Sequence, residues 1–446
     1  MELELLGKKT AVEIGGLIEI GKICPIELTD FYLQRINDSI ESKSIFTTVL
    51  KRRSLKISKE SKMRASSGMR KSIVDGVPIS IKDLADITNE FTLGGSTMIQ
   101  RQKANSDALF VKNLIANGLI PIGKTHMTEL AFSGLGLNPQ TKTPKNSLDS
   151  ELVPGGSSSG SAISVSRNLS VASIGSDTGG SVRIPAAWNN LVGLKTTLNS
   201  VSLKGVLKLC PNFDTIGPLC RSVEDAHALF CSLTQKKIKA LSPLKFPKLK
   251  FLIIKNVFFE KLNDDFKLSF DNQIENLKKL GATVEFKEFE EINKTLDISG
   301  IVFPAEAYAT WGKLIEKNPE KMFPPILNRF RGGKDIRASE YINSMSQLLS
   351  IRNIFLRKTM GYDAILTPSS PIKPPNIKKL LKDFNFFTEQ NILALRNTRM
   401  ANSLNLCSLT LPTNINFSGL MLFGRPNEEE KLLRIGLSIQ NEIPNT

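Results

Sequence analysis

The stretch from Pro154 to Thr197 reads PGGSSSGSAISVSRNLSVASIGSDTGGSVRIPAAWNNLVGLKTT. It places two clusters of glycine and serine, at 155–161 and 179–181, on either side of a short apolar segment. Glycine gives the backbone the freedom that is needed where amide groups crowd around a ligand or a nucleophile. One such cluster alone would favour a polar loop beside a helix or a strand. Two clusters, together with a lysine upstream, favour a site that carries out chemistry.

The composition is that of a large globular protein. The chain has 446 residues, 41% of them hydrophobic, which suffices for one large domain or for two to three ordinary ones. The five cysteines are not arranged as CxxC pairs, which argues against a metal cluster or a disulfide framework and favours a cytoplasmic location. The N-terminal sequence MELELLGKKTAVEIGG lacks the pattern of an export signal, and no stretch approaches the roughly 20 apolar residues of a membrane span. We therefore expect neither export nor a membrane partner.

The net charge of +16 raises the question of a polyanionic partner such as RNA. The basic residues are, however, spread along the chain, and only KKIKALSPLKFPKLK (236–250) forms a basic run. Scattered basic residues usually make a solvated surface. A nucleic-acid partner is not expected from this pattern.

Hydrophobic periodicity predicts an alternation of helices and strands. The sequence pattern predicts helices over 10–22, 26–42, 106–117, 222–229, 263–280 and 428–441, a polar surface helix over 54–67, and a largely helical region over 298–362. Alternating or continuous apolar runs predict strands over 75–87, 119–122, 248–259, 282–288 and 362–371. This order indicates an α/β fold, with a mixed central β-sheet covered by helices on both faces, in one large domain.

The segment GLIPIGKT (118–125) matches the sequence pattern of a phosphate-binding loop, which is a glycine, four residues and then Gly-Lys-Thr. Such a loop must present backbone N–H groups to phosphates and then open a helix. Here the residues before Gly123 are apolar and strand-like, and Pro121 has no N–H group to offer. We therefore predict a strand at this position and no nucleotide site.

Serine chemistry needs a base, which is most often a histidine. The chain has only two histidines. His227 lies in a charged helical stretch and is predicted to be a surface residue, and His126 has no orienting carboxylate at a recognisable spacing. Lys82, at the end of the strand over 75–87, would by itself be interpreted as a surface lysine. A serine–lysine arrangement is nevertheless the better hypothesis for this chain.

With these residues in view, the chain resembles the amidase signature family. The matching segments are GVPISIKD (76–83), GKTHMTELAFSGLGLNP (123–139), PGGSSSGS (154–161), GSDTGGSVRIPAAWNNLVGLKTT (175–197) and FDTIGPLCRSVEDA (213–226). The resemblance is specific over 76–226, weak over 235–360, and returns at TRMANSLNLCSLTLP (398–412). It implies one amidase domain over 1–446, in which the divergent region 235–360 selects the substrate.

The resemblance also assigns roles to three residues. Ser181 corresponds to the nucleophile, Ser157 to a bridging serine held by a cis peptide bond, and Lys82 to the base. Burial disfavours the charged form of a lysine and can lower its pKa by several units. A neutral Lys82 would then take the proton of Ser157, which would take the proton of Ser181.

The loop before Ser181 offers consecutive backbone amides to a substrate oxygen that becomes negative. By resemblance, Thr178, Gly179, Gly180 and Ser181 form the oxyanion hole. Asp177 and Arg183 flank this loop and are expected to brace it through a charge-assisted hydrogen bond, a surface ion pair being the alternative. Ser158 is expected to add a supporting hydroxyl group.

Several positions depart from the family pattern. Ser159 stands where a glycine is usual, Thr196 replaces a customary proline, and Trp188-Asn189-Asn190 replaces a run of smaller residues. Trp188 and the two asparagines either narrow the pocket or repack the core, and the sequence does not separate these alternatives.

The predicted function is hydrolysis of the carbon–nitrogen bond of a small carboxamide through an acyl-enzyme on Ser181. The resemblance implies neither a metal ion nor an organic cofactor, and the sequence leaves a homodimer open. One alternative is the A subunit of the glutamyl-tRNA(Gln)/aspartyl-tRNA(Asn) amidotransferase, which releases ammonia from glutamine; against it, Ile184 stands where that subfamily typically has glutamine. Another alternative is an inactive relative that serves as a binding protein, which would not need Lys82, Ser157 and Ser181 together.

Overall fold

Eleven strands form one mixed β-sheet, in the order β1-β3-β2-β4-β6-β5-β10-β11-β9-β7-β8. We describe it from a computed structural model of residues 3–442. Within the sheet, β2 is parallel to both β3 and β4, and β7 is parallel to both β8 and β9, whereas the other neighbours are antiparallel. The predicted α/β fold with a mixed sheet is confirmed. The domain predicted over 1–446 includes residues 1–2 and 443–446, which lie outside the described residues.

The strands are short, as buried strands in α/β proteins usually are. They are β1 (Phe46–Val49), β2 (Pro78–Lys82), β3 (Ile120–Thr125), β4 (Ala172–Asp177), β5 (Val192–Lys195), β6 (Thr215–Cys220), β7 (Lys250–Ile254), β8 (Thr283–Lys287), β9 (Ala364–Pro368), β10 (Cys407–Pro412) and β11 (Gly419–Gly424). The strands predicted over 75–87, 119–122, 248–259, 282–288 and 362–371 correspond to β2, β3, β7, β8 and β9. Strands β1, β4, β5, β6, β10 and β11 were not predicted from the sequence.

The helices fill the connections between the strands. They are α1 (Ala11–Glu19), α2 (Pro25–Asp38), α3 (Ser42–Ile45), α4 (Lys51–Ser66), α5 (Leu109–Ala116), α6 (Ser159–Ser166), α7 (Arg183–Ala187), α8 (Val223–Thr234), α9 (Asp264–Lys279), α10 (Glu290–Ile315), α11 (Pro324–Arg331), α12 (Ala338–Lys358), α13 (Ile377–Lys382), α14 (Phe384–Ser403) and α15 (Glu429–Glu442). Short 3₁₀ helices occur at Leu3–Lys8, Glu129–Ala131, Phe246–Lys248, Val257–Phe259 and Pro319–Lys321. All the predicted helices are present, and α14 is the long helix that was missed.

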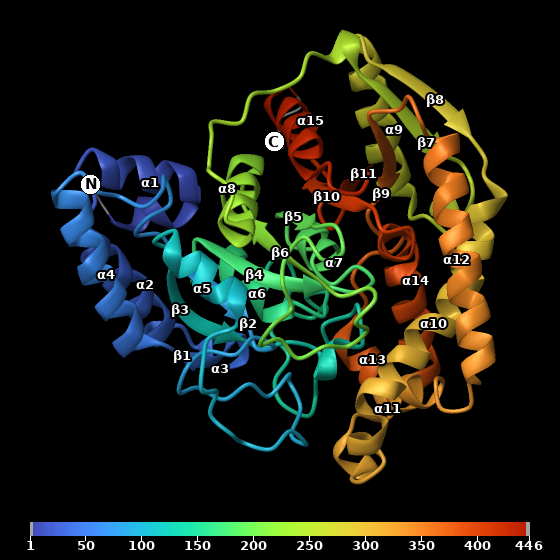
Figure 1. Cartoon of the computed structure of the whole chain (residues 1–446), viewed down its shortest axis with the longest axis horizontal. Coiled ribbons are helices and arrows are strands. Elements are labelled where there is room, and N and C mark those ends of the chain that lie inside the picture. The colour runs from blue at the N-terminus through green and yellow to red at the C-terminus, as the bar shows by residue number, and fades with distance from the viewer. Residues whose placement is uncertain (1–2, 443–446) are drawn as a thin grey trace.

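The side chains of the sheet alternate between two hydrophobic cores. On β7, Phe251 and Ile253 belong to one core, and Leu252 and Ile254 belong to the other, as the period of two along a strand requires. The first core also contains residues of α8, α9 and α15, and the second contains residues of α10, α12 and α14. Helices therefore cover both faces of the sheet, as predicted. Figure 1 shows α1, α2 and α4 at one end of the molecule and α10 and α12 at the other.

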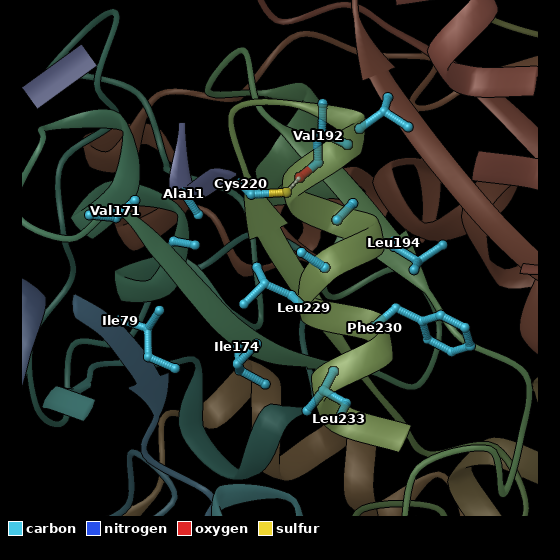
Figure 2. Packing of buried hydrophobic residues seen from close by; sticks show 14 of the residues in the cluster. Ala11, Ile79, Val171, Ile174, Val192, Leu194, Cys220, Leu229, Phe230 and Leu233 are labelled. Carbon is cyan, nitrogen blue, oxygen red and sulfur yellow. Dashed lines mark hydrogen bonds between the residues drawn. The ribbon is translucent and has the colours of Figure 1, made fainter. Parts of the chain in front are cut away.

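Helix α8 illustrates how the first core is packed. Figure 2 shows Leu229 and Leu233, one helical turn apart, next to Ile174 of β4 and the neighbouring strands. All three side chains are at most 1% exposed, and each such buried aliphatic side chain contributes about 1.5–3 kcal/mol to stability. The other side of α8 contacts α1, α5 and α15. On the sheet, α8 contacts β5 and β6, and β6 pairs with β4, the strand that leads directly into the loop that carries Ser181.

The segment that resembles a phosphate-binding loop is a buried strand. Gly123, Lys124 and Thr125 are the last residues of β3, and Lys124 Nζ pairs with Asp83 Oδ1 at 2.7 Å in the interior. The backbone of these residues pairs with β2, so it is not free to surround a phosphate. Among residues 3–442, none of the helices combines the length and the apolar character that crossing a membrane requires.

Candidate active site

Two parallel strands bring the predicted catalytic segments to one edge of the sheet. Strand β2 pairs with β4 so that Ile81 lies beside Ile174. The carboxyl ends of parallel neighbours point to the same edge, so Lys82, the last residue of β2, lies near the loop that follows β4. That loop carries Ser181, and Ser157 lies just before α6.

Lys82 is completely buried and has no carboxylate partner in the described part of the chain. Its Nζ atom donates to Ser157 Oγ at 2.7 Å and to Ser176 Oγ at 2.8 Å. Burial lowers the pKa of Lys82 to about 7, although the charges of Asp177 and Asp214 act in the opposite direction. Near pH 7 a large fraction of Lys82 is therefore neutral and can accept a proton.

Ser157 is held in a tight turn. The peptide bond between Gly156 and Ser157 is cis, as the resemblance implied. The Gly156 N–H donates to Gly134 O at 2.7 Å, and the Ser157 carbonyl accepts the Thr128 N–H at 3.1 Å. The segment over 128–134 thus fixes the turn that presents Ser157 Oγ to Lys82.

Ser181 lies beside this turn, but its side chain forms no hydrogen bond with that of Ser157 in the described structure. The two loops are joined by the Ser158 N–H, which donates to the Ser181 carbonyl at 3.2 Å. Among the described residues, Ser181 Oγ has no hydrogen-bond partner, so the hydrogen bond expected between Ser157 and Ser181 is not formed here. The Ser181 hydroxyl group instead borders a pocket. Hydrogen bonds between catalytic side chains are often long or absent in a substrate-free enzyme and form when the substrate binds.

Asp177 organises the loop that carries Ser181. Its carboxylate pairs with the Arg183 guanidinium at 2.9 Å, and both side chains are completely buried, so the expected bracing interaction is present and is not a surface pair. The same carboxylate accepts the N–H groups of Gly180 at 2.8 Å and Val182 at 3.0 Å. Burial alone would raise the pKa of Asp177, but the charge and hydrogen bonds of Arg183 outweigh it and lower the pKa to about 2.

One member of the predicted oxyanion hole has a hydrogen-bond partner within the protein. The Gly180 N–H faces Asp177 Oδ1, so it is not free to hold a substrate oxygen in this structure. In the described residues, no protein acceptor takes the N–H groups of Gly179 or Ser181. Of the four predicted donors, the N–H groups of Thr178, Gly179 and Ser181 are the ones without a protein acceptor among the described residues.

Helix α14 supports the loop from a distant part of the chain. Thr398 Oγ1 donates to Gly179 O at 2.7 Å, and Arg183 Nη2 donates to Asn402 Oδ1 at 2.6 Å. Gly180 has a φ of 142°, and a Cβ atom there would lie 2.1 Å from Thr398 Oγ1, so no other residue fits. These contacts were not predicted, and their only signal was the modest resemblance of TRMANSLNLCSLTLP (398–412).

Replacing Asp177 by alanine should lower the free energy of unfolding by about 3–5 kcal/mol, because Arg183 would remain buried without its carboxylate partner. Urea unfolding measures this change. Asp271→Ala is the matched control, since it removes an aspartate from an exposed pair with Lys267 and should have a much smaller effect. Equal losses in the two variants would contradict the bracing role of Asp177.

The remaining predicted residues have structural rather than reactive surroundings. Ser158 Oγ donates to Ser176 O at 3.2 Å, beside the hydroxyl group that Lys82 contacts. His126 is buried, and burial lowers its pKa to about 4. The prediction that His227 is a surface residue is wrong: it is only 5% exposed because α1, α5 and α15 surround α8, and its Nε2 atom lies 3.4 Å from Cys231 Sγ.

Trp188 and Asn189 repack the core rather than line the pocket. The Trp188 ring is completely buried in the second hydrophobic core. Asn189 Nδ2 donates to Pro154 O at 2.7 Å and to Pro185 O at 2.8 Å. Asn189 thereby ties the start of the turn at Ser157 to α7, just after Ser181.

Ser181 borders the inner part of a two-part pocket. Thr178, Gly179 and Leu395 line this part, whose volume is only about 20 Å³. The adjoining outer part holds about 300 Å³ between α10, α11 and α14. The two parts share three lining residues, which are Phe303, Arg329 and Arg399.

Comparison with known proteins agrees with this geometry. The model of the family described as Amidase matches residues 27–433. The chain is 29% identical to 2-amino-5-chloromuconic acid deaminase of Comamonas testosteroni, over 82% of this chain and 81% of that protein. It is 28% identical to the A subunit of the glutamyl-tRNA(Gln) amidotransferase of Ruminiclostridium cellulolyticum, over 97% of each chain. A crystal structure of an amidase superposes with a TM-score of 0.87 at 25% identity, covering 98% of this chain and 100% of that one. The chain therefore belongs to the amidase family, and it is a hydrolase that acts on amide carbon–nitrogen bonds.

Proposed function

We propose that the chain hydrolyses a small carboxamide through an ester intermediate on Ser181. The observation that carries this proposal is the 2.7 Å contact between Lys82 Nζ and Ser157 Oγ, made by a buried lysine whose pKa burial lowers to about 7. A lysine that is partly neutral at pH 7 can act as a general base. Ser157 lies between this base and the loop of Ser181, where it can pass a proton.

The proposed reaction has two halves. In the first, Ser181 Oγ attacks the amide carbon while its proton passes to Ser157 Oγ, and the proton of Ser157 passes to Lys82 Nζ. The N–H groups of Thr178, Gly179 and Ser181 hold the oxygen that becomes negative. Lys82 Nζ then returns the proton to Ser157 Oγ, and Ser157 gives its own proton to the leaving nitrogen, so that the carbon–nitrogen bond breaks and ammonia or an amine departs. In the second half, water attacks the ester in the same way and releases the carboxylate.

The pocket favours an unsubstituted carboxamide. The space next to Ser181 is small, about 20 Å³, which disfavours a bulky substituent on the leaving nitrogen. Ammonia would then be the leaving group. The relative from Comamonas testosteroni is named a deaminase, which is consistent with ammonia as a product.

An ester intermediate predicts partitioning between water and a stronger nucleophile. With hydroxylamine in the assay, the enzyme should form hydroxamate at the expense of carboxylate, because hydroxylamine captures the acyl group from Ser181. The hydroxamate and the carboxylate are both quantified by mass spectrometry, while ammonia release gives the total rate. If ammonia is released but hydroxamate does not exceed the amount formed without enzyme, direct attack by water replaces the proposed mechanism.

A second candidate function is that of one component of an amidotransferase, because the relative from Ruminiclostridium cellulolyticum aligns over nearly the full length of both chains. This function requires glutaminase activity and a partner protein that receives ammonia. Purification from the native host, followed by a glutaminase assay, distinguishes the two candidates. A co-purifying partner with glutamine as the best substrate would favour the second.

We further propose that the protein works in the cytoplasm as one domain. All five cysteines are free thiols, as is usual in a reducing compartment. Every residue assigned above comes from the same chain, so the proposed reaction does not require a second chain.

A further inference from the structure

Two arginines without carboxylate partners face the pocket that Ser181 borders. Arg329 comes from α11 and Arg399 from α14, and both line the inner and the outer part of the pocket. No carboxylate of residues 3–442 forms an ion pair with either guanidinium. The Arg329 guanidinium lies over the Phe132 ring, 4.4 Å from its centroid, and Arg399 Nη1 has only a long contact of 3.5 Å to Ser299 Oγ.

These two arginines are half-buried, and their surroundings differ from those of other buried and half-buried arginines. Arg183 is paired with Asp177, Arg64 is paired with Asp75, and Arg396 donates to the Glu260 carbonyl at 2.6 Å. Burying a charge without a partner is costly, so proteins normally pair it. Two guanidinium groups that lack carboxylate partners and lie next to the proposed nucleophile therefore indicate that the substrate itself carries the negative charge.

Both groups stay charged under assay conditions. Burial lowers the pKa of Arg329 to about 9, with a smaller contribution from the charge of Arg399, and burial lowers the pKa of Arg399 to about 10. Two cations repel each other, and a bound carboxylate would relieve that repulsion. The planar guanidinium matches a carboxylate with two parallel hydrogen bonds.

We infer that the substrate is the monoamide of a short dicarboxylic acid, whose carboxylate is bound by Arg329 and Arg399 while its carboxamide reaches Ser181. This inference rests on the proposed function and names its substrate class. The region over 235–360 supplies Arg329 and Phe303 to the pocket, which fits its predicted role in substrate selection. No aspartate or glutamate among the described residues lines either part of the pocket, so nothing there would pair with the ammonium group of an amino acid such as glutamine.

The test compares substrates that differ only in charge. Malonamate, succinamate and glutaramate are each assayed against the neutral diamide of the same length. At the best chain length, kcat/KM for the anion should exceed that for the diamide by about 10- to 100-fold, mainly through KM. Glutaramate should also be a better substrate than glutamine, which differs from it only by the ammonium group. A diamide that is hydrolysed as well as its anionic partner would overturn the inference and leave the proposed function intact.

Variants locate the effect. Arg329→Gln and Arg399→Gln should each lower the ratio of kcat/KM for anion over diamide by about tenfold or more, and Arg399→Lys should lower it less because it keeps the charge. Arg357→Gln, at an exposed position of α12, is the matched control and should leave the ratio unchanged. Thermal melting establishes that each variant is folded. If the ratio of kcat/KM for anion over diamide is unchanged in both Arg329→Gln and Arg399→Gln, the inference is wrong.

A binding measurement separates this inference from the proposed function. Calorimetric titration of the wild-type protein with malonate, succinate and glutarate does not require turnover, and at least one should bind more weakly to the Arg329→Gln and Arg399→Gln variants. Arginine-dependent binding without any amide hydrolysis would overturn the function but support an anion site. Hydrolysis of neutral amides without such binding would support the function and overturn the anion site.

Discussion

Replacing Ser181 by alanine is expected to lower kcat for hydrolysis of a small carboxamide by about 10⁴-fold or more. The hydroxyl group borders the pocket and has no hydrogen-bond partner among the described residues, so its removal takes away the attacking atom and leaves the packing intact. Ammonia release under saturating substrate measures kcat. The melting temperature should not change, because Asp177 and Arg183 still hold the loop.

A matched control uses another serine of the same region. Ser166 ends α6, and its hydroxyl group donates to Ile163 O at 3.4 Å, away from Lys82 and the pocket. Ser166→Ala should keep the wild-type kcat. If Ser181→Ala also keeps it, Ser181 is not the nucleophile, and the proposed mechanism is wrong.

Replacing Lys82 by methionine should lower kcat/KM by about 10²- to 10⁴-fold, because the general base is lost while the volume of the buried side chain is nearly kept. Lys82 is completely buried and has no carboxylate partner in the described chain, so methionine leaves no opposite charge unpaired. Thermal melting should therefore show a variant at least as stable as the wild type. A folded Lys82→Met variant that keeps the wild-type kcat/KM would show that Lys82 is not the base.

The pH profile assigns the base. Lys82 must be neutral to accept a proton, so kcat/KM of the wild type should rise about tenfold per pH unit below pH 7 and level off above it. Burial raises the pKa of the Asp214 carboxyl to about 6, so this group titrates in a similar range. Lys82→Met should abolish the rise if Lys82 is the base. A variant that keeps the same rise would assign it to another group, such as Asp214.

The sequence was informative where a single periodicity dominates. The strand that delivers Lys82 was predicted from apolar alternation, and the helix predicted over 222–229 is present as α8, which continues to Thr234. Helix α14 was missed because the face that it turns to the loop of Ser181 carries Thr398 and Asn402, so its buried side is not apolar. The short apolar runs of β10 and β11 gave no clear period, as is common for fully buried strands.

Only the site residues that lie in recognisable sequence motifs were predicted. The contact of Lys82 with Ser157 was expected from the resemblance, because the two residues lie in the matching segments 76–83 and 154–161. The hydrogen bond from the Gly180 N–H to Asp177 depends on the backbone conformation of the loop, which the amino-acid sequence alone does not specify. Arg329 and Arg399 come from helices distant in the sequence, and only the folded chain places them in one pocket.

The most direct test of the central claim is to locate the adduct that a fluorophosphonate forms with the wild-type protein. Such a reagent phosphonylates an activated serine hydroxyl group and does not require knowledge of the natural substrate. Peptide mapping by mass spectrometry should place the adduct on Ser181, and Ser181→Ala should remain unlabelled. An adduct on Ser157 with Ser181 unmodified, or no adduct at all in an enzyme that releases ammonia from amides, would contradict the proposed role of Ser181.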